Sequence, residues 1–203
     1  MAGGVYYGDM VSQSRGHAER LLPMISHVMS RAGVDFDALD CVITTLGPGS
    51  FTGLRVGLSV AKTMQSTLSI PVYGLSTFDA IALTAKCEEP YTVILESKRA
   101  DLYVCSYGSC TPFKSPQTAT AEMIKKLCPT HHIVTGDGSI NVTKCESEFF
   151  VHHPCDVADP ETIMNVFISN AKPMLFSQST APLYLRDADV SLSKKTKRQL
   201  AKV

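Results

Sequence analysis

The sequence lacks the features that mark membrane and secreted proteins, and it has no excess of either charge. No apolar run approaches the roughly 18 residues of a membrane-spanning helix, and residues 1–10 lack the basic start and apolar core of a signal peptide. Nineteen basic and nineteen acidic residues cancel, so no overall field attracts a nucleic acid. The local exception is a basic tail that begins at Lys194. We therefore expect a cytoplasmic protein that binds no membrane, with any direct RNA contact confined to this tail.

Closely spaced cysteine pairs are also missing. The seven cysteines are scattered, and no Cys-x-x-Cys pair occurs among them. Structural zinc sites usually draw their ligands from such pairs, and adjacent histidines on a strand point to opposite faces. We therefore expect reduced thiols and no bound metal. The one constellation that could still bind zinc consists of Cys128, His131, His132, Cys145, His152, His153 and Cys155.

The chain is organised around one glycine-rich stretch, Gly47–Gly57. An apolar, β-branched run at residues 41–46 leads into it and a helical pattern leads out, which predicts a tight turn between a strand and a helix. The helix would direct free backbone N–H groups and the positive end of its dipole toward anything above residues 49–52. Two interpretations stay open: a purely structural turn, and a site for an anion or a partner protein.

Two phosphate-binding motifs can be compared with this stretch, and neither is met. A Walker A loop needs Lys and then Ser or Thr after its last glycine, whereas Leu54 and Arg55 follow Gly53. The dinucleotide fingerprint needs its third glycine at the sixth place, whereas Gly53 stands at the seventh. The candidate residues for an anion or nucleotide site are Gly47, Gly49, Ser50, Thr52, Gly53 and Arg55.

Hydrophobic periodicity predicts alternating strands and helices, and hence an α/β architecture. A break at residues 88–90 indicates two lobes, residues 1–88 and 89–203. Strands are predicted at residues 5–11, 41–46, 72–75, 91–96, 102–107, 133–135 and 149–151. Helices are predicted at residues 17–32, 54–68, 77–85, 121–127 and 162–170. Ser76 and Asp159 are predicted to cap the third and the fifth helix. The second helix is apolar almost all round, so we expect it to be covered on several sides.

No combination of residues indicates catalysis by this chain alone. A nucleophile elbow needs glycine two residues before its serine, whereas Pro48 stands two residues before Ser50. Asp137 lies between two glycines, where it could bind a metal or a ribose, but Gly-Asp-Gly is first of all a good turn sequence. No paired acid and base with suitable spacing is found. The sequence therefore favours a scaffold or binding role.

Several short motifs follow one another along nearly the whole chain. They are residues 17–25 (HAERLLPMI), the glycine-rich stretch, residues 95–99 (LESKR) with Tyr103, the turn at residues 136–138, and residues 182–186 (PLYLR). In these motifs the chain resembles the bacterial TsaB family, whose members take part in making threonylcarbamoyladenosine in tRNA. The glycine-rich stretch is a highly specific part of the resemblance.

The resemblance implies an actin-like, ribonuclease-H-like fold of two lobes and a non-catalytic role. TsaB is similar to TsaD, the transferase that it binds, and the complex recruits the ATPase TsaE to modify tRNAs that read codons beginning with A. TsaD binds its metal through two histidines four residues apart on a helix, whereas Leu21 follows His17 here at that spacing. The resemblance implies no cofactor of its own, an indirect contact with tRNA, and at most a nucleotide shared at the partner interface.

The same resemblance implies that the helices at residues 17–32 and 53–68 form the partner surface, which could also support a homodimer. Two other functions stay open: a stand-alone ATP-dependent transferase or glycoprotease-like peptidase with an actin-like fold, and a homodimeric regulator. The implied interface residues are His17, Leu21, Met24, Ile25, Val28, Leu54, Gly57, Ala61 and Met64.

The start of the chain departs from the family pattern. The family opens with a strand that ends in Asp-Thr-Ser and continues with a second strand, and this chain begins after both. We expect a first lobe that lacks its opening strands, either because the start site is placed too late or because a shortened lobe depends on its partner. A shortened first lobe is expected to be only marginally stable alone.

Overall fold

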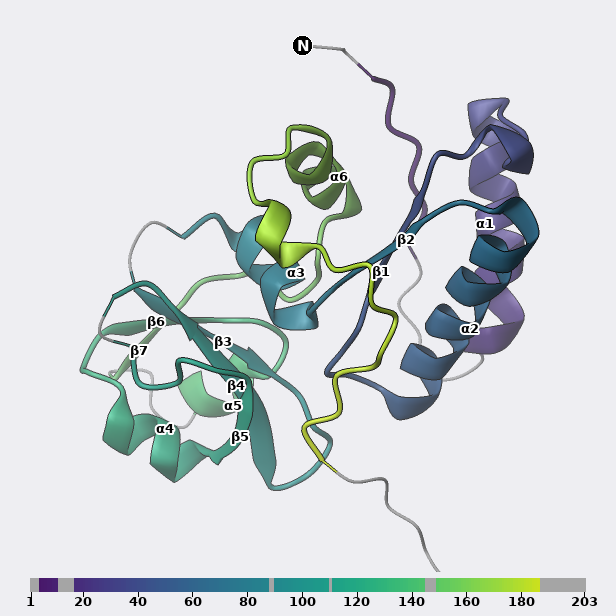
Figure 1. Cartoon of the computed structure of the whole chain (residues 1–203). Helices are drawn as coiled ribbons and strands as arrows, with labels where there is room; N and C mark the ends of the chain where they lie inside the picture. Colours follow the sequence, from purple (N-terminus) through teal and green to yellow (C-terminus); the bar gives the residue numbers. More distant parts are fainter. Residues whose placement is uncertain (1–3, 11–16, 88–89, 110, 145–148, 187–203) are drawn as a thin grey trace, which may run out of the picture.

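The structure, a computed structural model, describes residues 4–10, 17–87, 90–109, 111–144 and 149–186, without the side chains of residues 17 and 18. Figure 1 shows two lobes side by side, each with strands and helices, so the predicted α/β architecture is confirmed. Within the described ranges, no helix is both long enough and apolar enough to cross a membrane.

The first lobe is built on a parallel sheet of two strands. Figure 1 shows α1 and α2 on one side of this sheet and α3 on the other. The elements of this lobe are α1 (His17–Ala32), η1 (Phe36–Ala38), β1 (Val42–Thr45), α2 (Phe51–Leu68), β2 (Val72–Leu75) and α3 (Thr77–Ala85).

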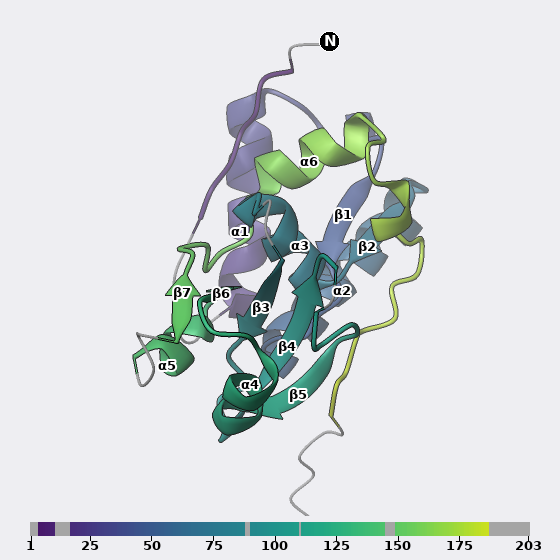
Figure 2. The same cartoon turned by 90° about the vertical axis from the view of Figure 1, so that its left-hand side faces the viewer.

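The second lobe is built on a mixed sheet of five strands in the order β5-β4-β3-β6-β7 (Figure 2). The β3–β4 and β4–β5 pairs are antiparallel, as the predicted hairpin requires, and the β3–β6 and β6–β7 pairs are parallel. Its elements are β3 (Tyr91–Leu95), β4 (Asp101–Tyr107), β5 (Gln117–Thr120), α4 (Ala121–Leu127), β6 (His132–Thr135), α5 (Ser139–Thr143) and β7 (Phe150–His152).

After β7 the chain returns to the first lobe. Ile163 of α6 (Pro160–Ile168) packs with Leu75 of β2 and Leu83 of α3 in one hydrophobic cluster, and η2 (Pro173–Leu175) follows. Ser177 then exchanges two backbone hydrogen bonds with Gly74, at 2.7 and 2.9 Å. The predicted division of the chain at residue 88 stays a prediction. The last elements, α6 and the segment at Ser177, pack against α3 and β2 of the first lobe.

The strand predicted at residues 5–11 is wrong for the part that the structure describes. Residues 4–10 form no strand and Val5 is 77% exposed, while Val11 lies outside the described residues. Aromatic and β-branched side chains favour a strand only where a neighbouring strand pairs with it, and no strand in the described ranges pairs with this segment.

Local capping explains where the helices begin. Ser76 Oγ accepts the Asp79 N–H at 3.0 Å, and Asp159 accepts the N–H groups of Glu161 and Thr162 at 3.2 and 3.0 Å, so both predicted caps are confirmed. The sequence predicts neither β5 nor α5. Both lie in polar segments, and β5 forms through its pairing with β4.

Burial is distributed unevenly between the two lobes. All five residues of β3 are buried, and they separate two hydrophobic clusters of the second lobe. By contrast, none of the four residues of β1 is buried, and no described side chain of α1 is. The second lobe therefore holds a closed core, whereas the first lobe leaves apolar surface partly uncovered.

A buried polar network lies in the second-lobe sheet. Thr92 Oγ1 lies 2.8 Å from His132 Nε2 and 2.7 Å from Ser106 Oγ, and all three residues are buried. Burial lowers the pKa of the His132 imidazole. The ring is therefore neutral in the folded protein at neutral pH, where it can share one hydrogen bond with Thr92.

We predict that His132 makes the protein less stable in mild acid. In the unfolded chain the imidazole takes up a proton near its usual pKa of about 6.5, whereas the folded protein resists protonation. The stabilising contribution is present above that pH and is lost as the pH falls, by at most about 1.4 kcal/mol per pH unit. Thermal unfolding between pH 7.5 and 5.5 measures it.

The comparison variant is His132→Gln, which should lose less stability over this pH range than the wild type. His27→Gln, at an exposed site on α1, should keep the wild-type slope. Equal slopes for the wild type and His132→Gln would show that this histidine is not the titrating group.

Two glycines should respond in opposite ways to alanine. Gly136 has φ of +96° and a Cβ there would lie 2.4 Å from the Ile94 carbonyl oxygen, so Gly136→Ala should lower the free energy of unfolding by at least about 2 kcal/mol. Gly57 lies inside α2 with no heavy atom within 4 Å of a Cβ, so Gly57→Ala should raise it by about 0.5–1 kcal/mol. Urea unfolding measures both, and a loss of stability in Gly57→Ala would contradict the open position of this glycine.

Candidate functional site

The glycine-rich stretch forms the predicted strand-to-helix turn. β1 leads through Leu46 into Gly47, which has φ of +100°, and α2 begins at Phe51. A Cβ on Gly47 would lie 3.0 Å from Leu54 Cδ2 and 3.1 Å from the Leu183 carbonyl oxygen. Glycine tolerates both this backbone angle and the close approach. The shape of the turn is therefore set by contact with a segment from the far end of the described chain.

The first turn of α2 leaves backbone donors without a partner. The helix begins three residues before the predicted Leu54, because Ser50 caps it: Ser50 Oγ accepts the Gly53 N–H at 3.4 Å. The first N–H groups of a helix have no acceptor inside it. Among the described residues, the N–H groups of Phe51 and Thr52 have no acceptor, so they are available to a ligand.

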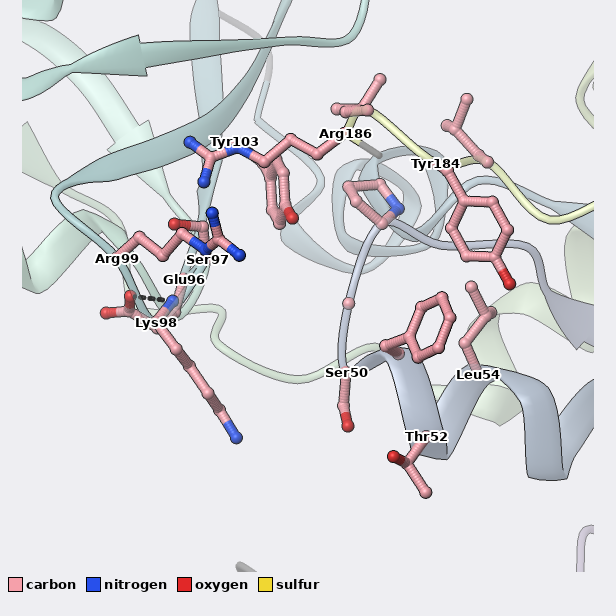
Figure 3. A pocket seen from close by; sticks show the side chains of 15 residues that line it. Ser50, Thr52, Leu54, Glu96, Ser97, Lys98, Arg99, Tyr103, Tyr184 and Arg186 are labelled. Carbon is pink, nitrogen blue, oxygen red and sulfur yellow. Dashed lines mark hydrogen bonds between the residues drawn. The ribbon is translucent and has the colours of Figure 1, made fainter. Parts of the chain in front are cut away.

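This turn forms one wall of a pocket of about 450 Å³ between the two lobes. Residues 96–99, which join β3 to β4, form the second wall together with Tyr103. The third wall is residues 183–186 of the segment that we call the C-terminal strap, residues 182–186. Figure 3 shows the Lys98 ammonium on one side of the pocket and the Ser50 and Thr52 hydroxyls on the other.

The charges that line the pocket are mostly positive. Lys98, Arg99 and Arg186 face a single acid, Glu96. Arg186 forms an ion pair with Asp101 of β4, and the Glu96 carboxylate accepts the Lys98 backbone N–H at 2.7 Å. The side chains that line the pocket therefore carry more positive than negative charge, which favours an anionic ligand.

The C-terminal strap is attached to both lobes. The Leu183 N–H donates to the Leu46 carbonyl at 2.7 Å, and the ring centroids of Tyr184 and Phe51 lie 5.5 Å apart. Arg55 Nε donates to the Tyr184 hydroxyl at 3.2 Å. Together with the ion pair of Arg186, these contacts hold the strap across the junction between the lobes, which Figure 1 shows as the yellow segment.

The structure brings together some of the residues expected at an anion site and adds others. Gly49, Ser50 and Thr52 line the pocket, whereas Gly47 and Gly53 shape the turn. The guanidinium of the remaining candidate, Arg55, lies 3.8 Å from the centroid of the Phe51 ring. Five further lining residues are not predicted at this site from the sequence: Lys98, Arg99, Tyr103, Tyr184 and Arg186. All five lie in the motifs quoted above, but their spacing gives no sign that they meet.

The implied partner residues of α1 lie on a helix that the chain covers only partly. Leu21, Met24, Ile25 and Val28 are half-buried, and the neighbouring Leu22 is 57% exposed. The side chain of His17 lies outside the described residues. Apolar side chains in this position can bury more surface if another protein covers them.

α2 has three different faces. Leu58 and Ala61 are buried within this chain, at 5% and 3% exposure, so Ala61 faces its own core. Leu54 lines the pocket. Ser59 and Ser66 lie on an exposed polar face. The third face is half-buried and apolar, and it consists of Val56, Gly57, Val60 and Met64.

The cysteines and histidines considered as metal ligands do not form a cluster in the described part of the chain. No three His, Cys, Asp or Glu residues in those ranges are placed to hold a metal ion. Cys145 lies outside the described ranges, and the His132 imidazole is hydrogen-bonded to the Thr92 hydroxyl. Burial raises the pKa of the Cys128 thiol to about 11.

Asp137 acts as a turn residue beside the pocket. Its Oδ1 accepts the backbone N–H of Glu96 at 2.9 Å, which ties the Gly136–Gly138 turn to the end of β3. Burial raises the pKa of the Asp137 carboxyl, although the hydrogen bond from Glu96 opposes this. The contact agrees with the interpretation of Gly-Asp-Gly as a turn sequence.

Comparison with known proteins places the chain among tRNA-modification proteins. The family model described as TsaD, tRNA N6-adenosine threonylcarbamoyltransferase, matches residues 11–198. The tRNA threonylcarbamoyladenosine biosynthesis protein TsaB of Buchnera aphidicola subsp. Schizaphis graminum is 33% identical over 195 residues, which are 89% of this chain and 88% of that protein. The tRNA N6-adenosine threonylcarbamoyltransferase of Erythrobacter litoralis is 39% identical over 98 residues, which are 45% of this chain but 28% of the transferase.

The fold agrees with this relationship. A crystal structure of a Pseudomonas aeruginosa protein with similarity to the peptidase YeaZ matches with a TM-score of 0.67 and 21% identity over 85% of each chain. The expected actin-like, ribonuclease-H-like fold is thereby confirmed. The chain spans only about a quarter to a half of the length of several curated relatives, 28% in the transferase above and 48% in a Mycobacterium bovis protein. The match along nearly the whole Buchnera protein and the family model together show that the chain belongs to the TsaB family, within the wider group that the TsaD model describes.

Proposed function

We propose that this chain is a non-catalytic subunit that binds and supports a TsaD-type transferase in the synthesis of threonylcarbamoyladenosine in tRNA. The observation that carries this proposal is the partly uncovered apolar surface of α1 and α2 in a member of the TsaB family. The tRNAs concerned are those that read codons beginning with A, and the reaction takes place in the cytoplasm. Contact with tRNA is indirect, through the transferase.

The shape of the surface suits a partner helix. Gly57 and Met64 share the half-buried face of α2, and no atom beyond the neighbouring helix backbone lies within 4 Å of the position of a Cβ on Gly57. A missing side chain on an apolar face lets a second helix pack closely against the backbone. The half-buried side chains of α1 lie beside it, since α1 packs on α2. A helical interface across both elements would bury the surface that the chain leaves uncovered.

The sequence of α1 supports a role without catalysis. Leu21 stands where the resemblance to TsaD places the second metal-binding histidine, and leucine offers no ligand atom. The transferase chemistry would then belong to the partner. A TsaE-type ATPase would join through the complex, and a homodimer would use the α1 and α2 surface when the transferase is absent.

The variant Gly57→Gln should abolish binding to the TsaD-type transferase encoded in the same genome. A long side chain at this position would occupy the space that a partner helix needs, whereas in the free chain its Cβ meets no atom of another element within 4 Å. Co-purification of the two proteins, followed by titration calorimetry, measures the effect. We expect micromolar or tighter binding by the wild type and at least a hundredfold weaker binding by the variant.

The control is Ser66→Gln, which places the same side chain on the exposed polar face of α2. This variant should bind like the wild type, and both variants should unfold at or above the wild-type temperature because glutamine favours helix. No binding by the wild type at micromolar concentrations would overturn the proposed function. Unchanged binding by Gly57→Gln would show that the partner uses another surface.

A further inference from the structure

The first-lobe sheet has one edge that no described strand covers. The N–H groups of Val42 and Leu46 donate to carbonyl oxygens on the β2 side, at 3.0 and 2.8 Å. Because successive residues of a strand direct their backbone groups to opposite edges, Ile43 and Thr45 direct theirs away from β2. Within the described ranges, β1 pairs with β2 alone. The described chain therefore offers the N–H and C=O groups of these two residues no strand partner.

β1 has the character of an interior strand and lacks the protection of an edge strand. α2 packs on one of its faces, and on the other Ile43 packs against the cluster that contains Leu75 and Ile163. Exposed edges usually carry a charge, a proline or a bulge that prevents pairing with another chain, and Val42–Thr45 contains no charge and no proline. The outer edge of β2, by contrast, is occupied by Ser177. The open edge of β1 is therefore suited to accept one more strand.

A segment that suits this edge lies at the start of the described chain. Residues 4–10 (GVYYGDM) contain a valine and two tyrosines, residue types that favour strands. They form no strand in their own chain, and Val5 and Met10 are 77% and 71% exposed. In the described ranges one hydrogen bond joins the segment to the rest of the chain, from Arg31 Nη1 to the Gly8 carbonyl at 3.3 Å. The segment can therefore leave this position at little cost.

We propose that residues 4–10 of a second copy pair with the open edge of β1, in a reciprocal exchange that gives a strand-exchanged dimer. Residues 11–16 join the segment to α1, and six extended residues span about 20 Å, which allows the segment to reach a neighbouring chain. A reciprocal exchange has two-fold symmetry, so it closes at the dimer. Because each chain supplies both a segment and an edge, the buried area is counted twice, as a specific interface of about 1,200 Å² or more requires.

This dimer uses a different surface from the helices proposed to bind the transferase. The strand pairing involves β1 and residues 4–10, whereas Gly57 lies inside α2. Gly57→Gln should therefore leave the strand-exchanged dimer intact while it removes any dimer formed through α1 and α2. The inference does not rest on the proposed function.

The test is sedimentation velocity of the Gly57→Gln protein across the micromolar range, combined with hydrogen exchange measured at single amides. We expect a monomer–dimer equilibrium, with the Ile43 and Thr45 amides exchanging at least about tenfold more slowly where the dimer predominates, because the new ladder protects them. Adding Tyr6→Pro and Tyr7→Pro together should make the protein monomeric. Adjacent prolines remove one N–H from each edge of the segment, so one of the two is a donor that the pairing needs.

The matched control is Tyr6→Ala with Tyr7→Ala, which removes the same rings but keeps both N–H groups and should still dimerise. Thermal unfolding checks that each variant is folded. A Gly57→Gln protein that stays monomeric throughout, or a dimer that the two prolines leave unchanged, would overturn the inference. Protection of the Ile43 and Thr45 amides in the monomer would also overturn it, since the segment would then pair within its own chain.

Discussion

The backbone contact between Leu46–Gly47 and the C-terminal strap is the constraint on which the pocket and both lobes depend. The Leu46 carbonyl accepts the Leu183 N–H at 2.7 Å, and the Gly47 carbonyl accepts the Thr77 N–H at 2.8 Å. The first bond ties the strap to β1, and the second ties the start of α3 to the same turn. Gly47 makes this crossing possible, since a side chain would meet the Leu183 carbonyl at 3.1 Å. The pocket therefore depends on Gly47, where the turn before α2, the start of α3 and the C-terminal strap meet.

The parts of the fold that local chemistry determines were predictable from the sequence. The Ser76 and Asp159 caps and the helix at Ala121–Leu127 depend on residues next to one another in the chain. The strand predicted at residues 5–10 does not form, because a strand needs a neighbouring strand to pair with. Conversely, β5 could not be predicted from its own polar sequence, because it forms by pairing with β4. For the pocket, the glycine turn could be predicted. Lys98 and Tyr184 could not be assigned to it, since no spacing rule relates segments brought together by a long crossover.

The two lobes differ in how completely they bury their apolar surface, and this difference agrees with the proposed role. In the second lobe, all of β3 is buried and a neutral His132 is held inside the sheet by Thr92. In the first lobe, β1 and α1 contain no buried described side chain. Each half-covered apolar side chain leaves hydrophobic free energy unrealised in the isolated chain. A partner on α1 and α2 would therefore add to the stability of the first lobe as well as to binding.

α2 connects the pocket with the surface proposed for the transferase. Its N-terminal residues Phe51 and Thr52 line the pocket, and Gly57 and Met64 lie on the half-buried face about one and a half and three and a half turns further along. A continuous run of backbone hydrogen bonds joins these two parts of the helix. A ligand that moves α2 would therefore change the partner surface. By linkage, any factor by which the ligand strengthens partner binding must equal the factor by which the partner strengthens ligand binding.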